Sequence, residues 1–260
     1  GTQVRTAWNP FHLFARDAPE ELSASLLLDY FSRRGPGGGL EGAYDGEGLM
    51  GLSGKYSGEF LGYYVHDRSE DNLGLDRRRL LPNDQNRGRL FLRHQHQLPY
   101  NISLFTESGF VSDRNFLEQW YENEFDQEKD QETKIAVEQN IDNLTLSLMA
   151  RLQVNDFENS TEWYPKGDLY VLGEPLFGSP VTWTSHASAG YANLHRADNP
   201  TDANDLFSPL PFVTGANGEV LMSRHQLTLP FNVGPLILSP YVVGEAARWG
   251  NDLTGDRKST

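Results

Sequence analysis

Hydrophobic and polar residues alternate one by one along much of this 260-residue chain. The clearest stretch is residues 144–155, where even positions from Leu144 to Val154 are apolar and odd positions, apart from Met149, are polar. Successive side chains of a β-strand point to opposite faces, so this stretch would have one apolar and one polar face. Its length also suits a tilted strand that crosses a membrane, which needs roughly 9–11 residues.

The same two-residue period recurs and predicts about a dozen strands. The predicted strands cover residues 22–32, 39–47, 53–66, 87–98, 102–110, 131–142, 144–154, 161–174, 181–191, 219–230 and 236–246. Short turns at 99–101 and 141–143 contrast with long polar connections at 69–86 and 196–218. Tight turns at one end and long loops at the other are typical of outer-membrane barrels, although soluble β-sandwiches also contain many alternating strands.

Two segments do not follow the strand pattern. Ser112 or Asp113 could cap a short helix near 113–125, because apolar side chains follow at helical spacing. The glycine-rich residues 35–39 lack the lysine and the following helix of a phosphate-binding loop, so we predict a turn there.

Composition narrows the class of protein. The chain has 22 Lys and Arg against 36 Asp and Glu, which gives a net charge of −14 and argues against a nucleic-acid-binding surface. The absence of cysteine excludes disulfides, cysteine-ligated metals and a cysteine nucleophile. No signal-peptide pattern opens the sequence, so we expect a mature or internal part of an exported protein.

Residues 86–120 contain a distinctive succession of motifs. A strand led by Asn86-Arg87 carries a histidine-rich polar face with His94 and His96, and a short turn and a second strand follow. The Ser112-Asp113 pair then precedes an aromatic residue. This order resembles the lipopolysaccharide-assembly outer-membrane family, also called the organic-solvent-tolerance or LptD family.

The downstream order is also similar, with an alternating hairpin over 135–154, a strand entering at 163–165, a long strand over 181–191 and a proline-ended strand before 230–231.

The resemblance implies an all-β fold, an antiparallel up-and-down transmembrane β-barrel in the bacterial cell outer membrane. Residues 1–260 would form a single barrel segment of about twelve strands, an interior part of a larger barrel. The family's N-terminal periplasmic domain and the remaining barrel strands would be absent. The implied function is to transport lipopolysaccharide and insert it into the outer leaflet. Its implied partners are lipopolysaccharide, the outer-membrane lipid bilayer, a plug lipoprotein and a periplasmic lipopolysaccharide-transport bridge, and no nucleic acid.

Transport of this kind breaks no bond, so we expect no catalytic residue, no cofactor and no metal. The polar residues expected to line the lumen are Arg151, Thr182, Thr184, His186 and Ser188. The i, i+2 spacing of His94 and His96 could supply two metal ligands, but the sequence provides no third one. Arg77-Arg78-Arg79 could contact lipid phosphates or simply be solvated.

Two other classes of protein remain open. An outer-membrane lipid-hydrolysing enzyme would need His186 and Ser188 to form a cluster with an acid, and a porin would be a closed, unplugged barrel. A soluble secreted β-sandwich or adhesin would bury the apolar face of residues 144–154 against a second sheet.

Overall fold

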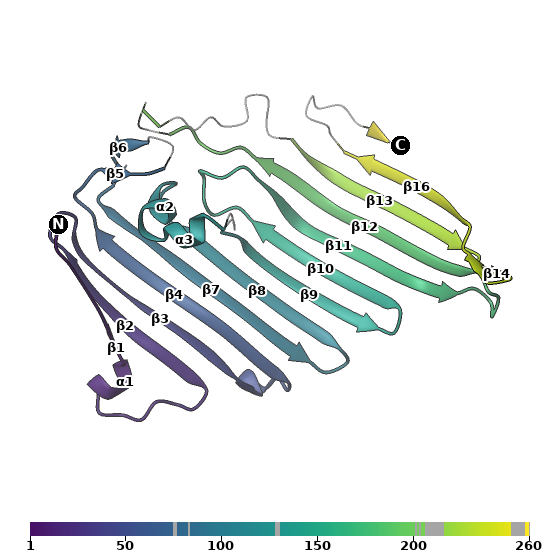
Figure 1. Ribbon diagram of the computed structural model, residues 1–260, viewed down its shortest axis with the longest axis horizontal. Coiled ribbons are helices and arrows are strands. Elements are labelled where there is room, and N and C mark those ends of the chain that lie inside the picture. The colour runs from purple at the N-terminus through teal and green to yellow at the C-terminus, as the bar shows by residue number, and fades with distance from the viewer. Residues whose placement is uncertain are drawn as a thin grey trace.

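A single large antiparallel sheet dominates the fold (Figure 1). The computed structural model describes residues 1–74, 77–82, 84–127, 131–200, 202, 204–205 and 216–250, and the backbone of 258–259. The sheet has 13 strands. They are β1 (Gln3–Trp8), β2 (Leu22–Phe31), β3 (Gly35–Glu47), β4 (Lys55–His66), β7 (Asn86–Leu98), β8 (Ile102–Val111), β9 (Thr133–Ile141), β10 (Leu144–Leu152), β11 (Ser160–Pro175), β12 (Thr182–His195), β13 (Asn217–Thr228), β16 (Tyr241–Trp249) and β17 (Lys258–Ser259).

Two small strand pairs lie outside the large sheet. They are β5 (Asp71–Asn72) with β6 (Arg78–Leu80), and β14 (Phe231–Val233) with β15 (Leu236–Leu238). The predicted strand over 236–246 is therefore divided between β15 and β16.

The strands of the large sheet pair in sequence order, each antiparallel to its predecessor. This confirms the expected up-and-down hairpin topology and excludes a Greek key. Strand β1, which no predicted strand covers, pairs with β2 from Gln3↔Phe31 to Trp8↔Leu26, so the predicted strand over 22–32 is the second strand of the sheet and not the first. Among the described residues, neither β1 nor β17 has a second neighbour, and the sheet is open at both edges.

From β4 onward, the two ends of the sheet differ in the length of their connections. At one end, which we call the tight-turn end, the chain turns within residues 98–102, 141–144 and 175–182. At the opposite, long-loop end, β4 connects to β7 and β8 connects to β9 through long segments, as Figure 1 shows along its upper margin. The predicted long connection at 196–218 lies partly outside the described residues.

Residues 35–39 belong to β3, and the prediction of a turn there is wrong. The turn lies instead at residues 32–34. The glycines are needed within β3 because the side chain of Tyr63 on β4 lies across this part of the strand. A Cβ atom on Gly39 would overlap the carbonyl oxygen of Gly62, and one on Gly37 would lie 2.6 Å from the Tyr63 hydroxyl oxygen. That hydroxyl donates a 2.7 Å hydrogen bond to Asp29 on β2.

The predicted helix near 113–125 is present as two short helices, α2 (Phe116–Trp120) and α3 (Glu122–Phe125). Tyr121, with φ −136° and ψ 48°, separates them. Neither Ser112 nor Asp113 caps α2, because the residue at the cap position is Asn115. Helix α1 (Pro10–Leu13) and a 3-10 turn, η1 (Leu49–Gly51), lie at the tight-turn end. None of the described helices is long and apolar enough to cross a membrane.

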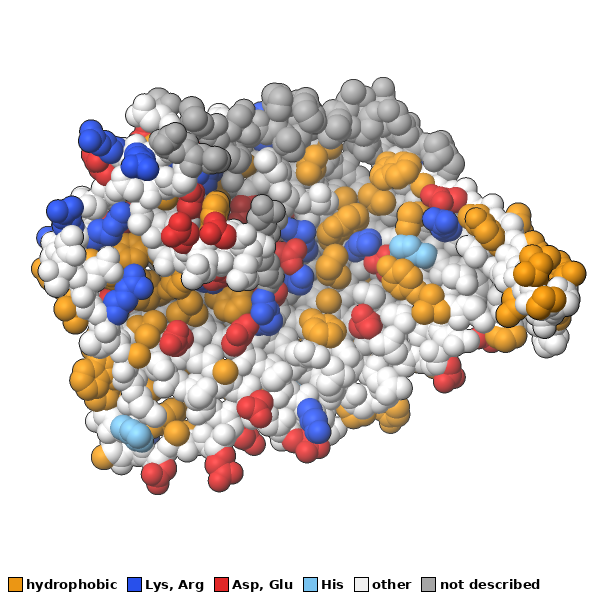
Figure 2. All heavy atoms as spheres, viewed as in Figure 1, with side chains coloured by type: hydrophobic (Ala, Val, Ile, Leu, Met, Phe, Trp, Pro, Cys, Tyr) orange, Lys and Arg blue, Asp and Glu red, His pale blue; other side chains and the backbone are white. Residues whose placement is uncertain are grey.

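A small core holds α2 and α3 against one face of the sheet. Tyr63, Val65, Val111 and Phe116 are buried together, and partly buried side chains including Trp120 pack around them. Figure 2 shows this face, on which acidic and basic side chains are spread over the sheet and around the helices. We call it the polar face.

The opposite face carries large apolar side chains that are exposed. The strand register places a contiguous set of them on this face: Leu28, Leu40, Tyr64, Leu90, Leu92, Phe110, Ile135, Val137, Leu146, Leu148, Leu221 and Leu227. On β10 the exposed fractions reach 41% at Leu146, 55% at Leu148 and 46% at Leu152. Nothing in the described part of the chain packs over these leucines as a second sheet would. We call this the apolar face.

Candidate functional site

Oppositely charged side chains pair across neighbouring strands of the polar face. Arg93 on β7 lies 2.8 Å from Glu59 on β4. Farther along the sheet, Glu132 contacts both Lys134 and Arg151, the latter at 3.2 Å. Side chains directly opposite each other on adjacent strands have Cβ atoms about 4.5–5.5 Å apart, so such pairs form without distortion. The result is a charged surface across the middle of the sheet.

All five residues predicted to line a lumen lie on the polar face. Thr182, Thr184, His186 and Ser188 occupy alternate positions of β12, and the register through β11 places Arg151 of β10 on the same side. Thr184 accepts a 3.2 Å hydrogen bond from a backbone N–H of β11. The structure brings His186 and Ser188 to one acidic residue, whereas Arg151 belongs to the separate Glu132 cluster.

Asp168 on β11 is the residue that joins His186 and Ser188. His186 Nε2 lies 2.9 Å from one carboxylate oxygen, and Lys166 Nζ lies 3.0 Å from the other. Ser188 is the residue directly opposite Asp168 on β12, and the Tyr170 ring stacks on His186 with centroids 4.2 Å apart. Serine hydrolases place the histidine between serine and acid, whereas here the acid lies between serine and histidine. The geometry is that of an ion-pair cluster, and Asp168 could have been anticipated only from the cross-strand register.

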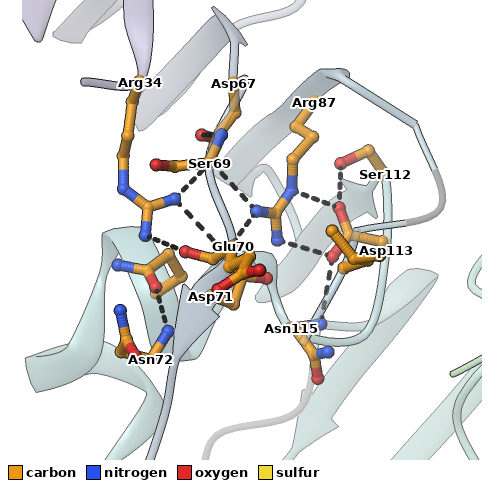
Figure 3. Close-up of polar contacts among 12 residues, drawn as sticks. Arg34, Asp67, Ser69, Glu70, Asp71, Asn72, Arg87, Ser112, Asp113 and Asn115 are labelled. Carbon is orange, nitrogen blue, oxygen red and sulfur yellow. Dashed lines mark hydrogen bonds and ion pairs between the residues drawn. The ribbon is translucent and has the colours of Figure 1, made fainter. Parts of the chain in front are cut away.

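A cluster of two arginines and three aspartates lies at the long-loop end (Figure 3). We call Arg34, Asp67, Asp71, Arg87 and Asp113 the arginine–aspartate clamp. Arg87 binds Asp113 through two bonds of 2.8 and 2.9 Å. Its Nη1 atom also reaches Asp71 at 2.8 Å and Asp67 at 3.1 Å. Arg34 lies 2.6 Å from Asp67 and 3.3 Å from Asp71.

The clamp is buried and fixes the long loops to the sheet. The side chains of Asp67 and Asp71 have 0% exposure, and that of Arg87 has 1%. Burial raises the pKa of Asp71 above its ordinary value, although both guanidinium groups act in the opposite direction. Arg87 also lies over the Phe116 ring, and Arg34 over the Trp120 ring. Charge pairing and ring contacts therefore hold the loop after β4 and helix α2 together.

Sequence reasoning singled out Asn86-Arg87 and Ser112-Asp113 as motifs but did not predict that they form one ion network. The available signal was an arginine near the start of β7 and an aspartate just after the end of β8. Because β7 and β8 are adjacent and antiparallel, those two positions meet at the same end of the sheet.

The loop arginines differ from one another. Arg77, predicted as a possible contact for lipid phosphates, instead binds Glu118 and Asn115, both at 2.8 Å, and Asp205 at 3.3 Å. Arg78 and Arg79 are exposed. Arg77 thus ties the loop to α2, and only its two neighbours retain the exposure that the lipid-phosphate hypothesis requires.

The prediction that His94 and His96 lie on a polar face is wrong. Both occupy the apolar face of β7, the same face as Leu90 and Leu92. The Tyr44 hydroxyl lies 3.0 Å from His94 Nδ1, and His96 is only 1% exposed. In the described part of the chain, no group of three or more His, Cys, Asp or Glu residues has the arrangement to hold a metal ion.

A groove of about 770 Å³ opens on the polar face between α3 and the segment around α1. Its lining combines both charges, with Glu41 and Glu59 on one side and Arg89 and Arg93 on another. Arg89 forms a bidentate pair with Glu124 of α3, at 2.6 and 2.9 Å. Such a surface offers both hydrogen-bond donors and acceptors to a hydrated ligand. Comparison of the chain with protein-family models and with curated proteins gives no match.

Proposed function

We propose that this chain forms part of the wall of a transmembrane β-barrel in the bacterial outer membrane, and that the barrel transports lipopolysaccharide into the outer leaflet. The observation that carries the proposal is the uncovered apolar face. Burying apolar surface stabilises a protein by about 25 cal/mol per Å², and soluble monomers rarely expose contiguous apolar patches larger than a few hundred Å². A lipid bilayer would solvate this face without any covering sheet.

The polar face supports an aqueous interior. Its ion pairs, some between strands and one along β11, would be costly in hydrocarbon but are stable beside water. The alternation of lipid-facing and lumen-facing side chains along each strand is the arrangement that membrane barrels require. The helices α2 and α3 and the arginine–aspartate clamp would then lie inside the barrel near one rim.

The open edges set a condition on this proposal. Unpaired backbone N–H and C=O groups cost several kcal/mol each in hydrocarbon, so strands must pair on both sides. The free edge of β1 and the free edge beyond β16 therefore have to pair with each other or with further strands when the protein is in a bilayer.

Lipopolysaccharide as the cargo follows from the resemblance of residues 86–120 to the lipopolysaccharide-assembly family. The groove of mixed charge would suit sugars and phosphates, while acyl chains would remain on the lipid side. The work is transport and requires no bond-breaking residue.

The rival functions fit the geometry less well. A soluble β-sandwich needs a second sheet over the apolar face, and among the described strands only two small pairs lie outside the large sheet. A lipid hydrolase based on His186 and Ser188 needs a hydrogen bond from serine to histidine, whereas here His186 Nε2 contacts Asp168 and Ser188 is paired with Asp168 across the strands. A porin would share the barrel wall but not the cargo.

Photo-crosslinking in cells tests the proposal. A benzoylphenylalanine residue at Thr184 on the polar face should crosslink to lipopolysaccharide, whereas the same residue at Leu148 on the apolar face should crosslink to membrane lipid. A protein that fractionates with the outer membrane but gives no lipopolysaccharide adduct at Thr184 would favour a porin or an enzyme. Recovery of the chain as a soluble protein would contradict the barrel itself.

A further inference from the structure

Strands β13 and β16 continue beyond the sheet as a projecting hairpin formed by β14 and β15. The register is the same on both sides of the interruption, as the pairs Thr228–Tyr241, Phe231–Leu238 and Val233–Leu236 show. Pro230 and Pro240 break the strand pattern, yet the backbone N–H of Leu229 still donates to the carbonyl of Pro240 at 3.0 Å. Gly234, with φ +59°, makes the turn at the tip. Residues 217–249 are therefore one continuous hairpin.

This projecting hairpin is apolar and free of charge. No Asp, Glu, Lys, Arg or His occurs between residues 229 and 243. Its large side chains are strongly exposed: Phe231 44%, Val233 53%, Leu236 61%, Ile237 76%, Leu238 43%, Tyr241 68% and Val242 63%. Figure 2 shows the resulting apolar cluster at the end of the molecule where β14 lies.

Beyond the interruption at Pro230 and Pro240, the exposed apolar side chains of the sheet are followed by those of the hairpin. Within the hairpin, Phe231 and Val233 share one face with their partners Leu238 and Leu236. Ile237 lies on the opposite face of the hairpin and is the most exposed of the set. A protein partner would cover one face, whereas a fluid lipid phase can surround both. The chemistry of the hairpin therefore favours lipid over a protein surface.

The backbone limits how deep the hairpin can lie. A two-stranded ribbon has unpaired N–H and C=O groups along both outer edges, and these are costly in the centre of a bilayer. Three prolines, Pro230, Pro235 and Pro240, remove some of these donors, but the carbonyl groups remain. The boundary between headgroups and acyl chains satisfies both requirements, because water reaches the backbone while side chains enter the hydrocarbon.

We propose that the β14–β15 hairpin is an anchor that inserts into the interfacial region of a phospholipid bilayer at the tight-turn end of the sheet. This inference rests on the proposed membrane location of the sheet. From Thr228 to Val233 the hairpin extends the apolar face by about 17 Å at roughly 3.3 Å per residue. It would thereby fix the depth of β13 and β16 in the membrane.

The chain contains no cysteine, so single labelling sites can be introduced cleanly. Ile237→Cys reports on the hairpin and Leu148→Cys on the apolar face of the sheet. Met50→Cys, in the exposed η1 turn at the same end, is the aqueous control, because Met50 is 94% exposed and outside the hairpin. Each variant of the full chain is spin-labelled and reconstituted in phosphatidylcholine vesicles, and collision rates with oxygen and with a water-soluble nickel chelate are measured.

We expect the label at residue 237 to collide with oxygen more often than with the nickel chelate. Its depth in the bilayer should be less than that of the label at residue 148. A label at 237 that is as accessible to nickel as the one at 50, with 148 still in lipid, would overturn the anchor but leave the barrel. Low collision with both reagents at 237 would mean that protein covers the hairpin and would also overturn it. Nickel access at 148 itself would refute the barrel proposal and, with it, the anchor.

Discussion

Substituting Leu148 with arginine separates a membrane-facing sheet from a soluble one. Leu148 is at the midpoint of β10, and its cross-strand neighbours on the apolar face are Val137 and Gly167. Neither can neutralise a guanidinium group. In a bilayer, an arginine on the lipid face near the midplane of a barrel costs about 2–4 kcal/mol. In water, Leu148 is already 55% exposed, so the same substitution should cost less than about 1 kcal/mol.

The control is Ser147→Arg, on the polar face of the same strand. Ser147 is directly opposite Asp168, so the new arginine would have a carboxylate within reach and should cost little. Both variants are refolded into phospholipid vesicles, and the free energy of unfolding is measured by urea titration followed through tryptophan fluorescence. If Leu148→Arg and Ser147→Arg lie within about 1 kcal/mol of each other, the apolar face does not contact lipid and the reasoning is refuted.

Three further outcomes are expected. Arg87→Met should lower the free energy of unfolding by about 3–5 kcal/mol, because it leaves the buried carboxylates of the clamp without their cation. An unchanged denaturant midpoint would mean that the clamp does not stabilise the fold. His186→Ala and Ser188→Ala should each leave lipopolysaccharide transport near the wild-type rate, whereas loss of lipid hydrolysis in a folded variant would favour the enzyme. Gly39→Ala should destabilise the sheet by about 1–3 kcal/mol, because the new methyl group would overlap backbone atoms of β4. Gly244→Ala is the control, since the space around Gly244 is open. Equal decreases in melting temperature for the two variants would contradict this packing argument.

Most of the sheet could be predicted from the sequence because each strand has its own two-residue period. Where that period is short or unusual, prediction failed. Strand β1 has only six residues, and the glycines of β3 look like a turn until the Tyr63 ring is known to cross them. The helix near 113–125 was predicted in the right place, but its break at Tyr121 depends on packing against the sheet.

The candidate site was less predictable. The alternation along β12 was enough to predict that Thr184 and His186 share one face, because the facing of side chains within a strand depends on that strand alone. Partners such as Asp168, and the clamp around Arg87, depend on which residues of other strands and loops come close in space. His94 and His96 show the converse error, because polarity suggested the polar face while the strand register places them on the apolar one.

The pairing of strands in sequence order has a kinetic consequence. Each strand pairs with the strand before it in the sheet, and several of these pairs are joined by tight turns. The entropy of closing those loops is modest, and it rises only slowly with length for the longer connections, so the sheet can grow by successive additions. The ion pair between Arg77 and Asp205 spans 128 residues and requires β7 to β12 to be in place first. Docking of the loop that carries Arg77 would accordingly be a late event in folding, and variants there should alter the unfolding rate more than the folding rate.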